Sequence, residues 1–102
     1  MFITTDGPLL VLSGDFDVRS TGEVRNAIYD LLESGEDTIA IDISRVDNVD
    51  VTALKVFAAA SRVAARSGRR IVLRGAGPAV LRMLHLSHLI RLIELDREPV
   101  AV

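Results

Sequence analysis

Short β-branched segments alternate with longer amphipathic ones along this 102-residue chain, and that alternation restricts the possible folds most strongly. One helical pattern lies between the apolar runs Leu9 to Ser13 and Thr38 to Ile43, and a second lies between Thr38 to Ile43 and Arg70 to Arg74. Both connections are long enough for right-handed crossovers between parallel strands. The sequence therefore predicts a mixed sheet with helices packed chiefly against one side.

The first helical segment opens with Ser20-Thr21-Gly22-Glu23, which has the S/T-x-x-E spacing of a capping box. Apolar residues then recur on one helix face, at Val24, Ala27, Ile28, Leu31 and Leu32. Gly35 stands where a helix commonly ends in a left-handed residue. We expect a helix that begins at a Ser20 cap and ends before Gly35.

Turn-forming residues mark the other boundaries. Asp6-Gly7-Pro8 predicts a hairpin between Phe2 to Thr5 and Leu9 to Ser13. Beyond the second helix, which we expect from about Val51 to Arg66, the predicted elements are a strand at Arg70 to Arg74, a helix from Pro78 to Leu84, a short turn capped by Ser87, and a strand at Leu92 to Leu95.

These elements predict an α/β fold over residues 1–102, with a single domain and the order β-β-α-β-α-β-α-(α)-β. The length suits one hydrophobic core. We expect a sheet of about five strands, packed with three to four helices.

Composition excludes several classes of function. The formal net charge of −2 gives no general attraction to nucleic acid or to an anionic membrane. The chain has no cysteine, and it has no apolar run of the ~20 residues that span a bilayer. His85 and His88 have no ligand partners at a zinc-like spacing, so we interpret them as surface residues. We predict a cytoplasmic protein that has no cofactor and is not an enzyme.

The polar stretch Ser44 to Asp50 is the segment most informative about function, because it joins a predicted buried strand to the second helix. Asp50 is a natural N-cap residue, which places Val51, Thr52 and Ala53 in the first helical turn. Backbone N–H groups are unpaired there, and the helix dipole favours anions. A phosphate on Thr52 would be well accommodated at this position.

Asp42 to Leu54 resembles "D-[IL]-S-x-V-x-x-[IV]-D-S-S-G-L", the signature of STAS-domain anti-sigma-factor antagonists. Two further segments strengthen the likeness. Leu12-Ser13-Gly14-Asp15-Phe16-Asp17 is similar to the early L-x-G-E-L-D of that family, and Arg70 to Leu84 resembles its R-[LI]-x-L-x-G-x-x-P-x-V-x-x-[LM]-L segment. The three motifs occur in the family's order, so the resemblance covers nearly the whole chain.

The resemblance implies a regulator of transcription, a phosphoprotein of the stress-response type that acts through protein-protein interaction. In that family an anti-sigma-factor serine/threonine kinase phosphorylates the second hydroxyl residue of the signature, which corresponds to Thr52. The unphosphorylated form binds the kinase and frees the sigma factor, and a phosphatase reverses the modification. We expect a monomer or weak dimer. Asp17, Asp50, Val51 and Ala53 would form the loop around the phosphosite, where Val51 replaces a Ser and Ala53 a Gly.

Helical geometry predicts a partner-binding face on the second helix. At ~100° per residue, a core side holds Leu54, Phe57, Ala58, Ser61, Ala64 and Ala65, and a solvent side holds Lys55, Arg62 and Arg66. Between them lies a stripe of Thr52, Val56, Ala59 and Val63. We interpret this stripe as a docking surface with Thr52 at its end; the competing interpretation is that Val56 and Val63 pack against a neighbouring helix.

Several alternatives stay open at this point. Thr52 could be a plain polar surface residue behind an Asp50 cap, and Asp15 and Asp17 could be ordinary turn residues rather than a carboxylate cluster. The chain could also be a small-ligand or nucleotide-binding module that uses the same helix N-terminus, or a scaffold subunit of a STAS-domain signalling assembly.

Overall fold

The computed structural model describes residues 1–96 of the chain. In chain order its elements are β1 (Phe2–Asp6), β2 (Leu9–Phe16), α1 (Thr21–Glu33), β3 (Thr38–Val49), α2 (Val51–Arg66), β4 (Arg70–Arg74), α3 (Pro78–Leu86), the 3₁₀ turn η1 (Leu89–Arg91) and β5 (Glu94–Leu95). This order confirms the predicted α/β arrangement. The last part of the predicted domain, 97–102, lies outside the described residues.

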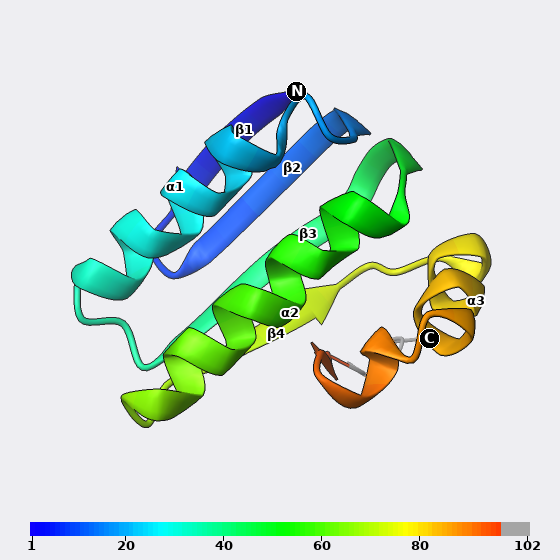
Figure 1. Ribbon diagram of the computed structural model, residues 1–102. Coiled ribbons are helices and arrows are strands. Elements are labelled where there is room, and N and C mark those ends of the chain that lie inside the picture. The colour runs from blue at the N-terminus through cyan, green and yellow to red at the C-terminus, as the bar shows by residue number, and fades with distance from the viewer. Residues whose placement is uncertain (97–102) are drawn as a thin grey trace, which may run out of the picture.

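The five strands lie side by side in their sequence order, β1-β2-β3-β4-β5. β1 and β2 are antiparallel, with Asp6 opposite Leu9, so the predicted hairpin is confirmed. The other three neighbouring pairs are parallel. Figure 1 shows α1 and α2 lying across the same face of the sheet, which also confirms the predicted layering.

The core fills the space between that face and the helices. Alternate residues of the central strands point into it, because successive side chains of a strand face opposite sides. These buried residues are Leu10 and Leu12 of β2, Ile39, Ile41 and Ile43 of β3, and Ile71 and Leu73 of β4. The rings of Phe16 and Phe57 meet with centroids 5.1 Å apart, which holds α2 against the end of β2.

β3 is longer than the sequence predicts. Residues 44–49, expected as a polar loop, continue the strand because they pair in parallel with the end of β2 through two register shifts. β4 pairs only as far as Asp42, so the extension has a neighbour strand on one side alone. This one-sided, exposed position accommodates the polar residues that suggested a loop.

The predicted capping box at Ser20 is wrong. Ser20 does occupy the N-cap position of α1, but its hydroxyl makes no capping bond to the helix. The side chain is buried and turned back toward the end of β2 and the residue that follows it. There its hydroxyl lies 3.1 Å from the Asp15 carbonyl and 3.2 Å from the Asp17 carbonyl, and accepts a bond from the Asp17 N–H at 3.2 Å.

Helix ends follow the expectations more closely. Gly35 has φ +91°, as expected for a left-handed residue after α1, and Pro78 lies in the first turn of α3. The Ser87 hydroxyl donates to the Met83 carbonyl at 2.7 Å, which closes α3, and it accepts the Leu89 N–H at 3.5 Å, at the start of the predicted short turn. The last predicted strand is shorter than expected, because β5 includes only Glu94 and Leu95.

Gly75 allows the chain to leave β4 against the side of β3. Its φ is +79°, and a Cβ added there would lie 2.8 Å from the Ser44 Cβ and 2.9 Å from the Ser44 nitrogen. No side chain fits such an approach to a neighbouring backbone. This glycine therefore lets the chain pass close to Ser44 of β3 on its way from β4 to α3, which contacts α2.

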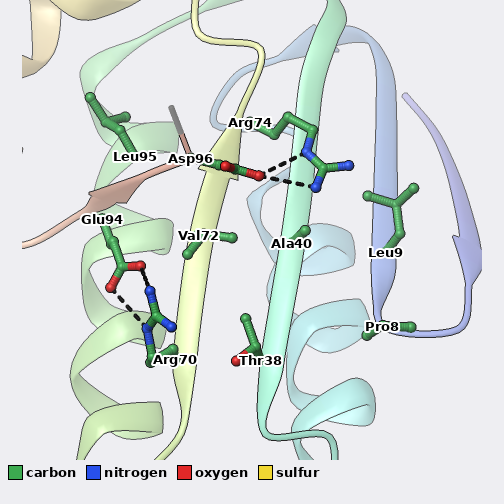
Figure 2. Close-up of a pocket in the computed structure, with 10 residues that line it drawn as sticks. All are labelled: Pro8, Leu9, Thr38, Ala40, Arg70, Val72, Arg74, Glu94, Leu95 and Asp96. Carbon is green, nitrogen blue, oxygen red and sulfur yellow. Dashed lines mark hydrogen bonds and ion pairs between the residues drawn. The ribbon is translucent and has the colours of Figure 1, made fainter. Parts of the chain in front are cut away.

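The opposite face of the sheet is not covered by helices in the described part of the chain. A hollow of about 520 Å³ lies over it, between the ends of β2 to β5. Figure 2 shows two ion pairs along this face, Arg70 with Glu94 and Arg74 with Asp96. These charged groups pair across strands, and the Val72 side chain between them is largely buried.

Candidate functional site

The junction between β3 and α2 is built around the Asp50 carboxylate. Asp50 has an extended backbone, with φ −108° and ψ 169°, and its Oδ1 accepts the Ala53 N–H at 2.7 Å. The Asp50 carbonyl accepts the Leu54 N–H at 3.1 Å, which begins the helical hydrogen-bond pattern. This is the predicted N-cap, and it leaves the N–H groups of Val51 and Thr52 at the open end of the helix.

Thr52 is exposed in the first turn of α2. Within residues 1–96, its hydroxyl is engaged in no side-chain hydrogen bond. The side chain is thus accessible to solvent beside the positive end of a 16-residue helix.

The segment 15–17 lies beside the junction because β2 and β3 end together. Phe16 pairs with Val49, and the Asp50 N–H approaches the Phe16 carbonyl at 3.4 Å. The Asn48 amide donates to the Asp15 carboxylate at 2.8 Å, a bond that the sequence did not predict. The expected proximity of the 15–17 segment to the Asp50 to Thr52 junction is therefore found.

The Asp17 carboxylate is paired with Arg19, two residues further along the chain. Its carboxylate accepts bonds from the Arg19 guanidinium at 2.8 Å and from the Arg19 N–H at 2.9 Å. These bonds hold the pKa of the Asp17 carboxyl below its usual value. Asp17 thus organises the loop before α1 and stays charged near the junction.

The predicted stripe on α2 lies along the side that meets α1. Thr52 and Ala59 are exposed, Val56 is half-buried against the core, and Val63 is 41% exposed. Val63 borders a shallow hollow of about 360 Å³ together with Tyr29, Leu32 and Glu33 of α1. The packing of Val56 and Val63 is therefore partial: they contact the domain and still present apolar surface.

The core side of α2 agrees with the expectation in most positions. Leu54, Phe57, Ala58 and Ala64 are buried, and Ser61 is half-buried. Ala65 is exposed, so its prediction as a core residue is wrong; the helix ends one residue later, where less of the domain lies beneath it. Ala53 and Ala60, which the sequence analysis left out of the core, are fully buried.

The two departures from the family signature have different surroundings. The Ala53 methyl faces the core, so it adds no bulk on the solvent side of Thr52. Val51 is 37% exposed and borders a hollow shared with α3. The sequence did not predict this hollow, because the third helical pattern was expected to end at Leu84, before the exposed Leu86.

Other candidate groups separate in space. His85 and His88 are exposed, and no cluster of three metal-ligating residues occurs within the described chain. Arg70, at the start of β4, is paired with Glu94 on the uncovered sheet face. None of the helices in residues 1–96 has the length and apolarity needed to cross a lipid bilayer.

The family model described as "Mlab, STAS domain" matches residues 3–94. The chain belongs to the STAS domain family. Its strand and helix order is that of the family's fold, and the Asp42 to Leu54 signature forms the β3–α2 junction described above. No curated protein sequence matches the chain significantly.

Solved structures share this fold at low sequence identity. An anti-sigma factor antagonist from Mycobacterium paratuberculosis has a TM-score of 0.76 and 22% identity, covering 96% of this chain and 85% of its own. The antagonist SpoIIAA of Bacillus is similar in its unphosphorylated form, with a TM-score of 0.75, 17% identity and coverage of 95% and 88%. Its phosphorylated form has a TM-score of 0.67, 18% identity and coverage of 95% and 91%.

Proposed function

We propose that this STAS domain is an anti-sigma-factor antagonist, which binds an anti-sigma-factor serine/threonine kinase and is released when the kinase phosphorylates Thr52. The observation that carries the proposal is the exposed Thr52 hydroxyl in the first turn of α2, beside the Asp50 cap. A kinase needs such a hydroxyl, because its catalytic base must reach the proton and its ATP must be in line with the oxygen. SpoIIAA, a fold relative, occurs in both phosphorylated and unphosphorylated forms.

The stripe beside Thr52 supplies the docking surface in this proposal. Ala59 and Val63 are exposed and Val56 half-buried, so the partner would cover apolar surface along one side of α2. Phosphorylation adds about −1.5 to −2 charge at the end of that surface. A loss of ~1.4 kcal/mol in binding weakens affinity tenfold, so one phosphate is sufficient to release the partner.

The first experiment incubates the purified protein with anti-sigma-factor kinases, ATP and Mg²⁺, and maps any phosphosite by mass spectrometry. We expect modification at Thr52 and none in Thr52→Ala. Thr5→Ala is the matched control, since Thr5 is an exposed hydroxyl on β1, the strand at the edge of the sheet. Modification of the Thr52→Ala variant at the wild-type rate would contradict the proposal.

The second experiment measures binding of the kinase that modifies the protein. Thr52→Glu should weaken the complex at least ~10-fold by calorimetry, while Thr5→Glu should leave affinity unchanged. Val63→Ser should weaken binding without abolishing phosphorylation of Thr52. Equal affinities of wild type and Thr52→Glu for the kinase would contradict the proposal that phosphorylation of Thr52 releases the partner.

Two competing functions predict different results. A small-ligand or nucleotide-binding module would show ligand-dependent thermal stabilisation in the absence of any protein partner. A scaffold subunit would form a discrete oligomer by light scattering. Either result, together with no phosphorylation by the kinases, would replace the proposed function.

A further inference from the structure

A second apolar surface lies on the other side of α2 from the stripe. It is a hollow of about 350 Å³ between the start of α2 and the length of α3, lined by Val51, Ala79, Arg82, Met83, Leu86 and Ser87. Leu86 is 76% exposed and Val51 is 37% exposed. Exposed apolar side chains that gather around a hollow mark interaction sites more often than isolated ones do.

The charged residues on the α3 side of this hollow are basic. Residues 75–93 contain Arg82 and Arg91 and no Asp or Glu. On the α2 side, Asp50 directly precedes Val51 and turns its carboxylate onto the Ala53 N–H. Arg82 is the one charged residue in the lining, and it is exposed. An apolar hollow with an exposed arginine at its α3 side favours a segment that combines an apolar side chain with a carboxylate.

We propose that this α3 hollow, defined by Val51, Met83, Leu86 and Arg82, binds an acidic amphipathic segment of a partner protein. An apolar side chain of the segment enters the hollow, and a carboxylate beside it pairs with the Arg82 guanidinium. Helical segments bind apolar grooves in this way, with anchors at i, i+3 and i+4. The proposal rests on the proposed function only for the identity of the partner, as a second contact of the same kinase.

The geometry favours a protein segment over a membrane surface. Electrostatic attachment to anionic lipids takes clusters of about 4 to 8 Lys or Arg residues, whereas α3 itself contains one arginine, Arg82. A concave lining also suits an inserted side chain better than a lipid interface. A vesicle measurement distinguishes the two surfaces.

Val51 acquires a specific role in this arrangement. The family signature has a Ser at this position, and a Ser hydroxyl would interrupt the apolar wall that Val51 forms with Met83 and Leu86. Because residues on a helix differ by ~100°, Val51 faces the α3 side while Thr52 faces the stripe side. The two neighbouring residues thus belong to two different surfaces, and Val51 favours an apolar side chain of the bound segment in the α3 hollow.

The test uses a synthetic acidic peptide of about 14 residues, with leucines at i, i+3, i+4 and i+7 and glutamates elsewhere. Two matched peptides replace the leucines by serine or the glutamates by lysine. Titration into ¹⁵N-labelled full-length protein should shift the amide signals of Val51, Met83 and Leu86. The acidic peptide should bind at least ~5-fold more tightly than the lysine peptide, and the serine peptide should not bind measurably.

Four variants locate the binding site. Val51→Ser and Leu86→Ser should each weaken the acidic peptide about tenfold, and Arg82→Glu should reverse the preference between acidic and lysine peptides. Leu92→Ser is the matched control: Leu92 is 46% exposed in the same basic segment but outside the lining of the hollow. Its affinity should equal that of wild type. The substituted side chains are exposed, so thermal melts should confirm that the variants fold.

Three outcomes would overturn the inference: shifts centred away from α3, equal binding of the acidic and lysine peptides, or equal weakening by Leu86→Ser and Leu92→Ser. A fourth is Leu86-dependent binding to phosphatidylserine vesicles without peptide binding, which would make the surface a membrane contact. The peptide needs neither ATP nor Thr52. Failure here leaves the phosphorylation switch intact, and failure of phosphorylation leaves the α3 hollow intact.

Discussion

The junctions that lead into α1 and α2 use the side chain at the N-cap position in opposite ways. Each follows the carboxyl end of one of two neighbouring parallel strands, β2 or β3, and each has a common capping residue at the N-cap position. Asp50 turns its carboxylate forward onto the Ala53 N–H, whereas Ser20 turns its hydroxyl back onto the Asp15 and Asp17 carbonyls. The residue type permits a cap, but the unsatisfied groups around it decide where the side chain bonds.

The difference has a functional consequence. The α1 junction uses its polar side chains internally, through Ser20 and through the Asp17–Arg19 pair. The α2 junction uses Asp50 alone to order the turn and leaves Thr52 exposed. We expect the first to respond to substitution mainly in stability and the second mainly in binding.

The third junction, between β4 and α3, gives the largest expected effect. It depends on backbone rather than on a side-chain cap, since Gly75 lies within contact distance of Ser44 at a positive φ. Gly75→Ala should lower the free energy of unfolding by about 3 kcal/mol, from the clash and the unfavourable φ together. Urea denaturation of the wild type and the variant measures this difference in the free energy of unfolding. Gly22→Ala is the control, because a Cβ at Gly22 meets nothing within 4 Å and α1 should gain up to about 1 kcal/mol.

Ser20→Ala should be the next most costly change, at about 2 kcal/mol. It removes a buried hydroxyl that serves the loop backbone at Asp15 and Asp17, and it leaves those groups with fewer partners. Thr21→Ala is a matched control, since that hydroxyl bonds the Val18 carbonyl in an exposed position and should be worth a few tenths of a kcal/mol. Equal losses in the free energy of unfolding for Ser20→Ala and Thr21→Ala, measured by chemical denaturation, would contradict a stabilising role of the buried Ser20 hydroxyl at the α1 junction.

Asp50→Ala should cost about 1 kcal/mol, the usual value of a lost N-cap. Asp50→Asn keeps an acceptor for the Ala53 N–H and should cost only a few tenths. Thermal unfolding followed by circular dichroism compares them. A larger loss in Asp50→Ala than in Ser20→Ala would show that the forward cap, not the inward hydroxyl, is the stronger support.

The smallest expected effect concerns the charge state of Asp17. Its pKa is lowered chiefly by the side-chain bond from Arg19, so Arg19→Gln should raise that pKa toward 3.8. A depressed pKa gives stability that is present above the unfolded value and lost as the pH falls through the folded value. An NMR titration of the Asp17 carboxyl carbon measures the change. An unaltered titration curve in the variant would show that Arg19 does not set the charge of this loop.

Much of the fold could be predicted because local patterns and tertiary packing agree. The helix periodicities, the Asp50 cap, Gly35 and Pro78 all describe requirements that a segment meets within its own few residues. The strand at residues 44–49 could not be predicted because its partner, β2, is distant in the sequence. The Ser20 cap was wrong for a local reason, since the nearby carbonyls of Asp15 and Asp17 compete with the helix for the Ser20 hydroxyl.

The sequence was sufficient to predict the position of Thr52, but it was not sufficient to predict the hollow beside Val51. Placing Thr52 in the first turn of α2 needs only the Asp50 cap and the helical repeat. The hollow beside Val51 depends on the packing of α3 near the start of α2, and no local pattern in 75–86 contains that information.

By itself, the sequence determined the alternation of strands and helices, the motif at Asp42 to Leu54 and the helical phase that separates Thr52 from the core. Short-range hydrogen bonds and side-chain periodicity are sufficient for these features. Tertiary structure alone decided the length of β3 and the closeness of Val51 to Met83 and Leu86. Both depend on groups far apart in the chain, whose positions only the packed sheet and helices bring together.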